Sequence, residues 1–129
     1  MESKTEWRMY FLVMYNLSGI QKGIQSGHAA LEYVEVYGDT WQYRDFIKNH
    51  KTFILLDGGG SSDMCNNFEK LMNLGVRAIP FYEPDLNDSV SAIAFLVPSE
   101  IYNLDTLEIN EGYNFEFNKF LKEFRLASN

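Results

Sequence analysis

Hydrophobic residues along this chain fall into short continuous runs and into longer segments with helical spacing. The continuous runs predict strands that are buried on both faces. They cover residues 8–16, 52–56, 76–82 and 90–97. Only a polar turn containing Pro84 separates the last two runs, so they are expected to form an antiparallel hairpin.

Segments with helical spacing lie between and after these strands. Apolar residues recur three or four positions apart in them, and glycines follow two of them as stop signals. The predicted helices cover residues 20–37, 41–48, 64–74 and 114–125, and Ser61, Ser62 or Asp63 can cap the third of them. Because strands alternate with helices, we predict an α/β fold: a single three-layer domain with a four-stranded mixed sheet. We place this domain at residues 1–102. A C-terminal extension, 103–129, carries an aromatic amphipathic helix that packs on the domain or on a partner.

Composition narrows the class of protein. The chain has 129 residues, of which 46% are hydrophobic and 22% charged, as in soluble globular proteins. No apolar run approaches the ~20 residues of a membrane span, and the polar N-terminus is unlike a secretory signal. The single cysteine, Cys65, cannot form an internal disulfide. We therefore expect a cytoplasmic protein (in the host cytoplasm if the gene is viral) with no membrane partner, no metal and no cofactor.

The charge balance limits the kind of nucleic-acid contact. Eleven Lys and Arg residues stand against eighteen Asp and Glu residues, which gives a formal net charge of −7. Binding along a nucleic acid depends on Lys and Arg that neutralise phosphates. An extended nucleic-acid surface is therefore not expected, although a small basic pocket on an acidic body remains compatible with this balance.

The first candidate site is the beginning of the helix predicted over 20–37. Gln21, Gln25 and His28 lie on one side of this helix, and His28 is suited to act as a general base or to orient a polar ligand. Glycines recur every four residues on another side; they are Gly19, Gly23 and Gly27. Because a glycine inside a helix costs ~1 kcal/mol relative to alanine, these positions indicate close approach of a ligand or of another backbone. The alternative is a tight contact between helix and sheet.

Two loops are further candidates. Residues 57–62 carry three consecutive glycines before a helix, an arrangement that is suited to bind an anion. The phosphate-loop motif is absent, however, and a flexible connection is the alternative.

The turn between the last two strands carries an aromatic ring and three carboxylates; they are Tyr82, Glu83, Asp85 and Asp88. This turn is suited to supply a general base or hydrogen bonds to ribose hydroxyls, and the alternative is a self-capping hairpin loop.

The element order and one motif together resemble the type 2 peptidyl-tRNA hydrolase family. That family opens with a buried strand and a Gly-Lys-Gly-Lys-x-x-x-Gln-x-x-His-Ala segment that enters a long helix. Residues 18–31 here read Ser-Gly-Ile-Gln-Lys-Gly-Ile-Gln-Ser-Gly-His-Ala-Ala-Leu. Gln25, Gly27 and His28 align, and the resemblance covers roughly residues 8–102. It implies the family's α/β fold, a homodimer and a site where the helix start meets the acidic turn.

This chain departs from the family at the charged positions of the motif. With Gln25 and His28 in register, the two motif lysines, which act on the tRNA and the scissile ester, correspond to Gly19 and Gln21. Lys22 lies one residue beyond the second position and points roughly 100° around the helix from it. The family's Asp-x-Gly-Arg-Thr turn becomes Glu-Pro-Asp-Leu-Asn-Asp, in which Glu83 still supplies an acid.

The resemblance and its departures lead to a first functional hypothesis. The protein is expected to be a peptidyl-tRNA hydrolase-like protein that is catalytically altered and that binds a small nucleotide-like ligand. Such a binder would sequester a signalling nucleotide, as small viral anti-defence proteins do. The ligand-binding residues in this hypothesis are Gly19, Gln21, Gly23, Gln25, Gly27, Tyr82, Asp85 and Asp88.

Two alternatives remain open. The first is an active peptidyl-tRNA hydrolase acting at the tRNA 3′ end, with His28 and Glu83 handling protons and Lys22 as a displaced cation. The second is a non-catalytic protein-interaction module, which the phenylalanine-rich helix near the C-terminus favours. A homodimer is compatible with all three hypotheses.

Overall fold

Strand β1 (Trp7–Val13) lies inside a four-stranded mixed sheet whose order is β2-β1-β4-β3. It runs parallel to β2 (Thr52–Asp57) and antiparallel to β4 (Ser89–Pro98), and β3 (Ala78–Glu83) pairs antiparallel with β4. The predicted hairpin and the partly parallel sheet are confirmed. Met9 to Val13 are all buried, because helices cover both faces of this strand, and this explains the continuous apolar run.

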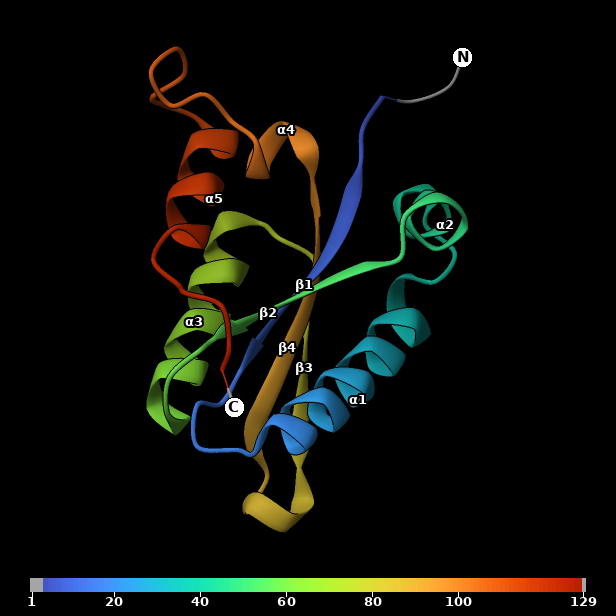
Figure 1. Ribbon diagram of the computed structural model, residues 1–129, viewed down its shortest axis with the longest axis vertical. Coiled ribbons are helices and arrows are strands. Elements are labelled where there is room, and N and C mark those ends of the chain that lie inside the picture. The colour runs from blue at the N-terminus through green and yellow to red at the C-terminus, as the bar shows by residue number, and fades with distance from the viewer. Residues whose placement is uncertain (1–3, 129) are drawn as a thin grey trace.

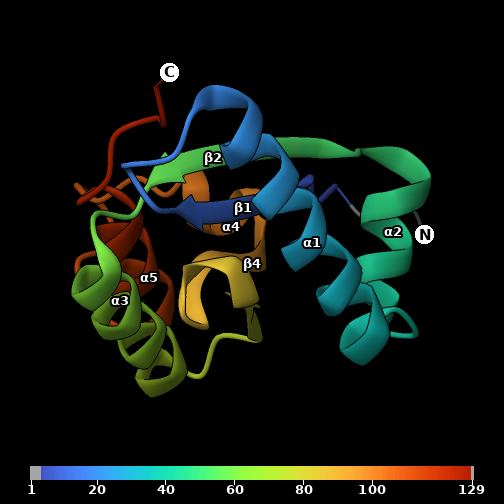
Figure 2. The ribbon, with the colours of Figure 1, turned by 90° about the horizontal axis from the view of Figure 1, so that it is seen from below.

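Helices cover the two faces of the sheet in two groups (Figures 1 and 2). On one face lie α1 (Gly19–Tyr37) and α2 (Trp41–Asn49). On the other lie α3 (Ser61–Leu74), α4 (Ser99–Tyr102) and α5 (Tyr113–Leu121). A single 3-10 turn, η1 (Pro84–Leu86), joins β3 to β4. The computed structural model describes residues 4–128, and among these no helix has the length and apolar character needed to cross a bilayer.

Two hydrophobic cores lie on the two sides of the sheet, and alternate residues of β1 contribute to each. Phe11 packs toward α1 and α2, whereas Leu12 packs toward α3 and α5. The helix ends follow the expected signals. Gly75 ends α3 in the left-handed conformation that glycine favours, and Ser18 caps α1. The expected strand over 8–16 ends earlier, at Val13, because the chain turns there toward α1.

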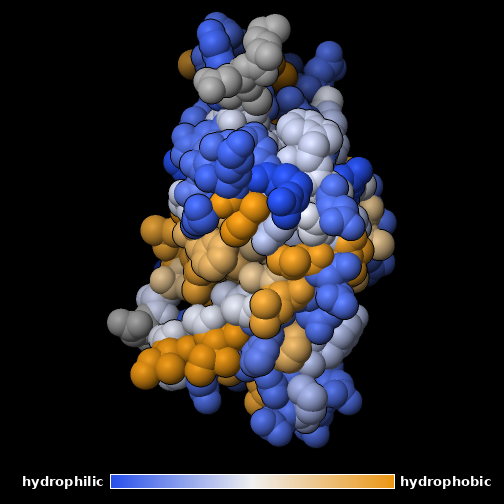
Figure 3. All heavy atoms as spheres, turned by 90° about the vertical axis from the view of Figure 1, so that its right-hand side faces the viewer, coloured by the Kyte–Doolittle hydropathy of each residue, from blue (hydrophilic) through white to orange (hydrophobic). Residues whose placement is uncertain are grey.

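Helix α1 has nearly the expected bounds, but its apolar face is turned to solvent and its more polar face to the sheet. The apolar residues that predict this helix point to solvent: Ile20 is 79% exposed, Leu31 is 71% exposed, and Ile24 between them is also exposed. The face that packs on the sheet is largely polar. Its buried residues are Lys22, Gln25, Ser26, Ala29 and Tyr33. Figure 3 shows this side of the molecule, where hydrophobic residues gather over α1.

The C-terminal segment closes the opposite face and one edge of the sheet. Phe117, Phe120 and Leu121 of α5 are buried in the core against the strands of the same chain. The residues after α5 then run along β2, where Leu126 forms an antiparallel bridge with Leu56. The end of the chain therefore covers part of an edge strand that would otherwise expose its backbone groups.

Candidate functional site

The side chains that the sequence places in one site at the start of α1 contact three different neighbours. Lys22 is only 5% exposed, and its Nζ donates a hydrogen bond to the backbone carbonyl of Ser128. Gln25 is buried under the helix and accepts a hydrogen bond from Ser91 Oγ of β4. His28 lies at the surface, where its ring stacks on Phe81 of β3 with 4.6 Å between ring centroids.

The other polar groups near this helix start are used in local structure. Gln21 completes a capping box: its Oε1 accepts the Ser18 backbone N–H at 3.2 Å, and its own N–H donates to Ser18 Oγ at 3.1 Å. In the acidic turn, Glu83 Oε1 accepts the Asp85 backbone N–H at 3.2 Å, while Asp85 itself is exposed. Tyr82 and Asp88 are exposed as well.

A catalytic arrangement needs a proton-handling group and a charge-stabilising group that reach the same reacting atom. Here Lys22 points to the C-terminal tail and His28 to β3, and each already has a partner. The best-defined cavities among the described residues have volumes of 170 to 450 Å³, and Lys22, His28 and Glu83 line none of these.

The hydrogen bond between Ser91 and Gln25 gives a prediction about stability. Replacing Ser91 with alanine leaves Gln25 Oε1 buried without a donor, which costs about 1–3 kcal/mol of unfolding free energy. Chemical denaturation measures this loss, and Ser89→Ala on the same strand, which is less buried, serves as the control. The double variant Gln25→Met/Ser91→Ala removes both polar partners and should recover most of the loss. A loss that the double variant does not reduce would contradict this assignment.

The glycines of α1 have open space around them. An added Cβ at Gly23 or Gly27 meets no atom within 4 Å, so no backbone of the same chain approaches there. We therefore expect Gly23→Ala and Gly27→Ala each to raise the unfolding free energy by about 1 kcal/mol, through helix propensity alone. Thermal denaturation at low protein concentration measures this gain, and a loss of stability in either variant would contradict it.

The three-glycine loop carries its own carboxylates. Asp57 Oδ1 accepts the Gly59 backbone N–H at 3.0 Å, and Asp63 Oδ2 accepts the Gly60 N–H at 3.0 Å. Both carboxylates and Glu123 line the adjacent cavity of about 300 Å³. Because the amides of the three glycines already have acceptors, and three carboxylates stand against one cation, Arg125, in this cavity, the loop is poorly suited to bind phosphate.

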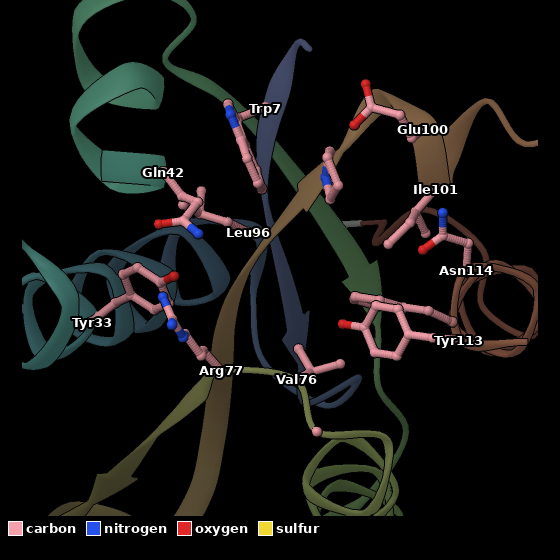
Figure 4. A pocket seen from close by; sticks show the side chains of 13 residues that line it. Trp7, Tyr33, Gln42, Val76, Arg77, Leu96, Glu100, Ile101, Tyr113 and Asn114 are labelled. Atoms are coloured by element: carbon pink, nitrogen blue, oxygen red, sulfur yellow. The ribbon is translucent and has the colours of Figure 1, made fainter. Parts of the chain in front are cut away.

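A groove forms at the other end of the sheet, where β4 extends beyond β3. The first residue of β3, Ala78, pairs with Phe95, so β4 from Leu96 to Pro98 has β1 on one side and the groove on the other. The groove has a volume of about 350 Å³, within the range of small-molecule sites. Figure 4 shows the side chains that line it. They are Trp7, Tyr33, Gln42, Val76, Arg77, Leu96, Pro98, Glu100, Ile101, Tyr113, Asn114 and Phe117.

The guanidinium group of Arg77 lies at one end of the groove. Arg77 points toward Tyr33 (Figure 4), and its Cζ lies 5.7 Å from the centroid of the Tyr37 ring. Burial raises the pKa of the Tyr33 phenol, and the nearby Arg77 charge opposes this rise. The phenol is therefore neutral at physiological pH and remains a hydrogen-bond donor beside the positive charge of Arg77, an exposed side chain. Gln42 adds a side-chain amide at the same end.

The other end of the groove is built by α4 and α5. Asn118 Nδ2 donates to the backbone carbonyl of Ile101 at 2.7 Å, and this bond fixes the two helices to each other. The same arrangement places Tyr113 and Asn114 at the groove wall, with Glu100 above them in Figure 4. Tyr113 is half-exposed, so its ring is available to a ligand while burial of the phenol raises its pKa.

A larger cavity, of about 450 Å³, lies between α5 and strands β1 and β2. Its walls are mainly apolar. Two cations line it, Arg8 and Lys122, and Arg8 already lies on the Tyr102 ring, 4.0 Å from the centroid. Within residues 4–128 no three His, Cys, Asp or Glu side chains come together in a group able to hold a metal ion. The 350 Å³ groove therefore has the best combination of aromatic, amide and charged side chains for a polar ligand.

Sequence reasoning missed the groove because no spacing marks it. Its residues come from six helices and strands besides the α3–β3 connection, so they meet only in the folded chain. Arg77, which follows Gly75 at the end of α3, carries no motif. The sequence matches no protein-family model and, at a significant level, no curated protein.

Proposed function

We propose that this protein is a non-catalytic binding protein that takes a small nucleotide-like ligand in the groove beside β4. The observation that carries this proposal is the presence of one guanidinium group, on Arg77, among aromatic and amide side chains in a groove of about 350 Å³. Recognition of a nucleotide needs a cation for the phosphate, an aromatic surface for the base and amides for polar edges.

The two ends of the groove differ in charge, which suggests an orientation for the ligand. Arg77 and Glu100 lie at opposite ends in Figure 4. A phosphate bound at Arg77 stays away from the Glu100 carboxylate. Oε1 of this carboxylate accepts hydrogen bonds from Thr5 Oγ1 and Ser99 Oγ, which leaves Oε2 to accept one from a ribose hydroxyl or a base amino group. Tyr113 offers a ring on which the base stacks. With a net charge of −7 on the chain, binding of an anion depends strongly on Arg77.

Calorimetric titration with mono-, di- and cyclic nucleotides tests this proposal. We expect Arg77→Gln to weaken binding by about tenfold to a hundredfold, because it removes a charge-assisted hydrogen bond. His28→Ala, outside the groove, should leave the affinity unchanged. The bound nucleotide should be recovered chemically intact, as sequestration requires. Binding lost in His28→Ala but kept in Arg77→Gln would move the site to the start of α1 and contradict the proposal.

Hydrolysis of peptidyl-tRNA is the second candidate, supported by the resemblance of residues 18–31. The geometry disfavours it because Lys22 is hydrogen-bonded to the C-terminal tail, whereas the His28 ring stacks on Phe81 of β3. We expect no release of an N-acylated amino acid from tRNA by the purified protein, even at high concentration. Turnover that disappears in His28→Ala would establish the hydrolase instead.

A further inference from the structure

The outward face of α1 combines exposed apolar side chains with glycines, and the helix carries its acidic residues near its C-terminal end. Its exposed apolar side chains and glycines follow one another in steps of three or four residues, as in the seam of paired helices. We call this face the α1 seam. It consists of Ile20, Gly23, Ile24, Gly27, Leu31 and Val34. Beside Val34 it continues into an apolar cleft of about 170 Å³ that Ile47 and Phe53 also line.

Large apolar side chains of the seam face glycines of the seam when two copies of the helix are packed antiparallel. Two antiparallel copies of α1 that cross at Gly27 place Leu31 of each copy opposite Gly23 of the other. The same crossing places Ile20 opposite Val34. An added Cβ at Gly23 or Gly27 meets no atom within 4 Å, so both glycines leave space for a partner side chain. A self-complementary patch of this kind is what a two-fold interface requires.

The charges of α1 also fit an antiparallel partner. The helix has no acidic residue in its first turn and no basic residue in its last turn. Its carboxylates, Glu32 and Glu35, instead lie near the C-terminal end, where the helix dipole disfavours negative charge. An antiparallel copy brings its own positive N-terminal end beside these carboxylates. The pairing therefore relieves an unfavourable arrangement that the isolated chain retains.

From these observations we infer that two copies of this chain associate through antiparallel packing of their α1 seams, with a two-fold axis near Gly27. Each copy then buries the apolar residues that its α1 otherwise exposes to solvent. The groove beside β4 is not part of this contact, so each copy keeps its ligand site. This inference does not depend on the proposed function.

Sedimentation across a wide range of protein concentration tests the association. We expect a monomer–dimer equilibrium that Leu31→Glu weakens by about tenfold or more, because the charge enters the centre of the contact. Val36→Glu is the matched control, since Val36 is an exposed apolar residue of the same helix that lies off the seam. A monomer at every concentration, or a dimer that Leu31→Glu and Val36→Glu affect equally, would overturn the inference.

Cross-linking tests the direction of packing in a Cys65→Ser background. In the antiparallel arrangement, a chain with Ile20→Cys should form a disulfide with a chain that carries Val34→Cys. It should not link to a second Ile20→Cys chain, because fourteen residues at ~1.5 Å each separate these positions along the helices by about 21 Å. Self-linking of Ile20→Cys, with no linking to Val34→Cys, would contradict the antiparallel pairing.

Discussion

Replacing Phe117 with alanine is expected to lower the unfolding free energy by about 3–5 kcal/mol. Phe117 is 1% exposed, and its ring lies 6.0 Å from that of Phe95 in β4 and 5.9 Å from that of Tyr113, measured between centroids. The substitution leaves a cavity where α5 meets the sheet. Because small domains are stable by only ~5–15 kcal/mol, this loss removes a large part of the total.

The same change should also damage the groove, since Tyr113 and Asn114 depend on the position of α5. Chemical denaturation measures the loss of stability, and nucleotide titration below the unfolding transition measures the loss of affinity. Leu107→Ala is the control, because this apolar side chain is fully exposed in the loop before α5 and its truncation should change neither quantity. A stable Phe117→Ala variant would show that α5 does not hold the core together.

Removing residues 125–129 is expected to cost about 2–3 kcal/mol of unfolding free energy. This segment makes two backbone hydrogen bonds with β2: Asp57 N–H donates to the Arg125 carbonyl and Ala127 N–H to the Leu55 carbonyl, each at 2.9 Å. It also supplies the Ser128 carbonyl that accepts from Lys22 Nζ. Net contributions of ~1 kcal/mol for each bond give the expected sum.

Hydrogen exchange locates this effect in the chain. The Asp57 amide should exchange much faster after the truncation, because its acceptor is the Arg125 carbonyl. Arg125→Ala and Leu126→Ala are controls that keep the backbone and should have little effect, since both side chains are exposed. Unchanged stability together with an unchanged Asp57 amide would contradict the proposed role of the tail at the sheet edge.

The four strands and helices α1, α2, α3 and α5 could be predicted because each carries a local signal, whereas the four-residue helix α4 was missed. The apolar run of β1 reflects burial on both faces, and Gly75 marks the end of α3. The hairpin of β3 and β4 follows from the short polar turn between them. In these segments the local preference and the tertiary structure agree, which is the condition under which sequence patterns succeed.

The orientation of α1 could not be predicted in the same way. Its apolar residues indicate a helix, but the face that contacts the sheet is formed by polar residues such as Gln25, whose partner Ser91 is 66 residues away in the chain. The groove was equally hidden, because Arg77 and Tyr113 acquire a common environment only through the packing of α4 and α5. Long-range pairings of this kind leave no periodic trace in the sequence.

The most direct test of the proposed function is a nuclear magnetic resonance titration of the protein with adenosine 5′-monophosphate. We expect saturable shifts of the signals of Gln42, Arg77 and Tyr113, which lie at the two ends of the groove. Signals of Gln25 and His28 should stay in place. Shifts confined to Gln25, His28 and Tyr82 would contradict binding in the groove and place the ligand where α1 meets the acidic turn.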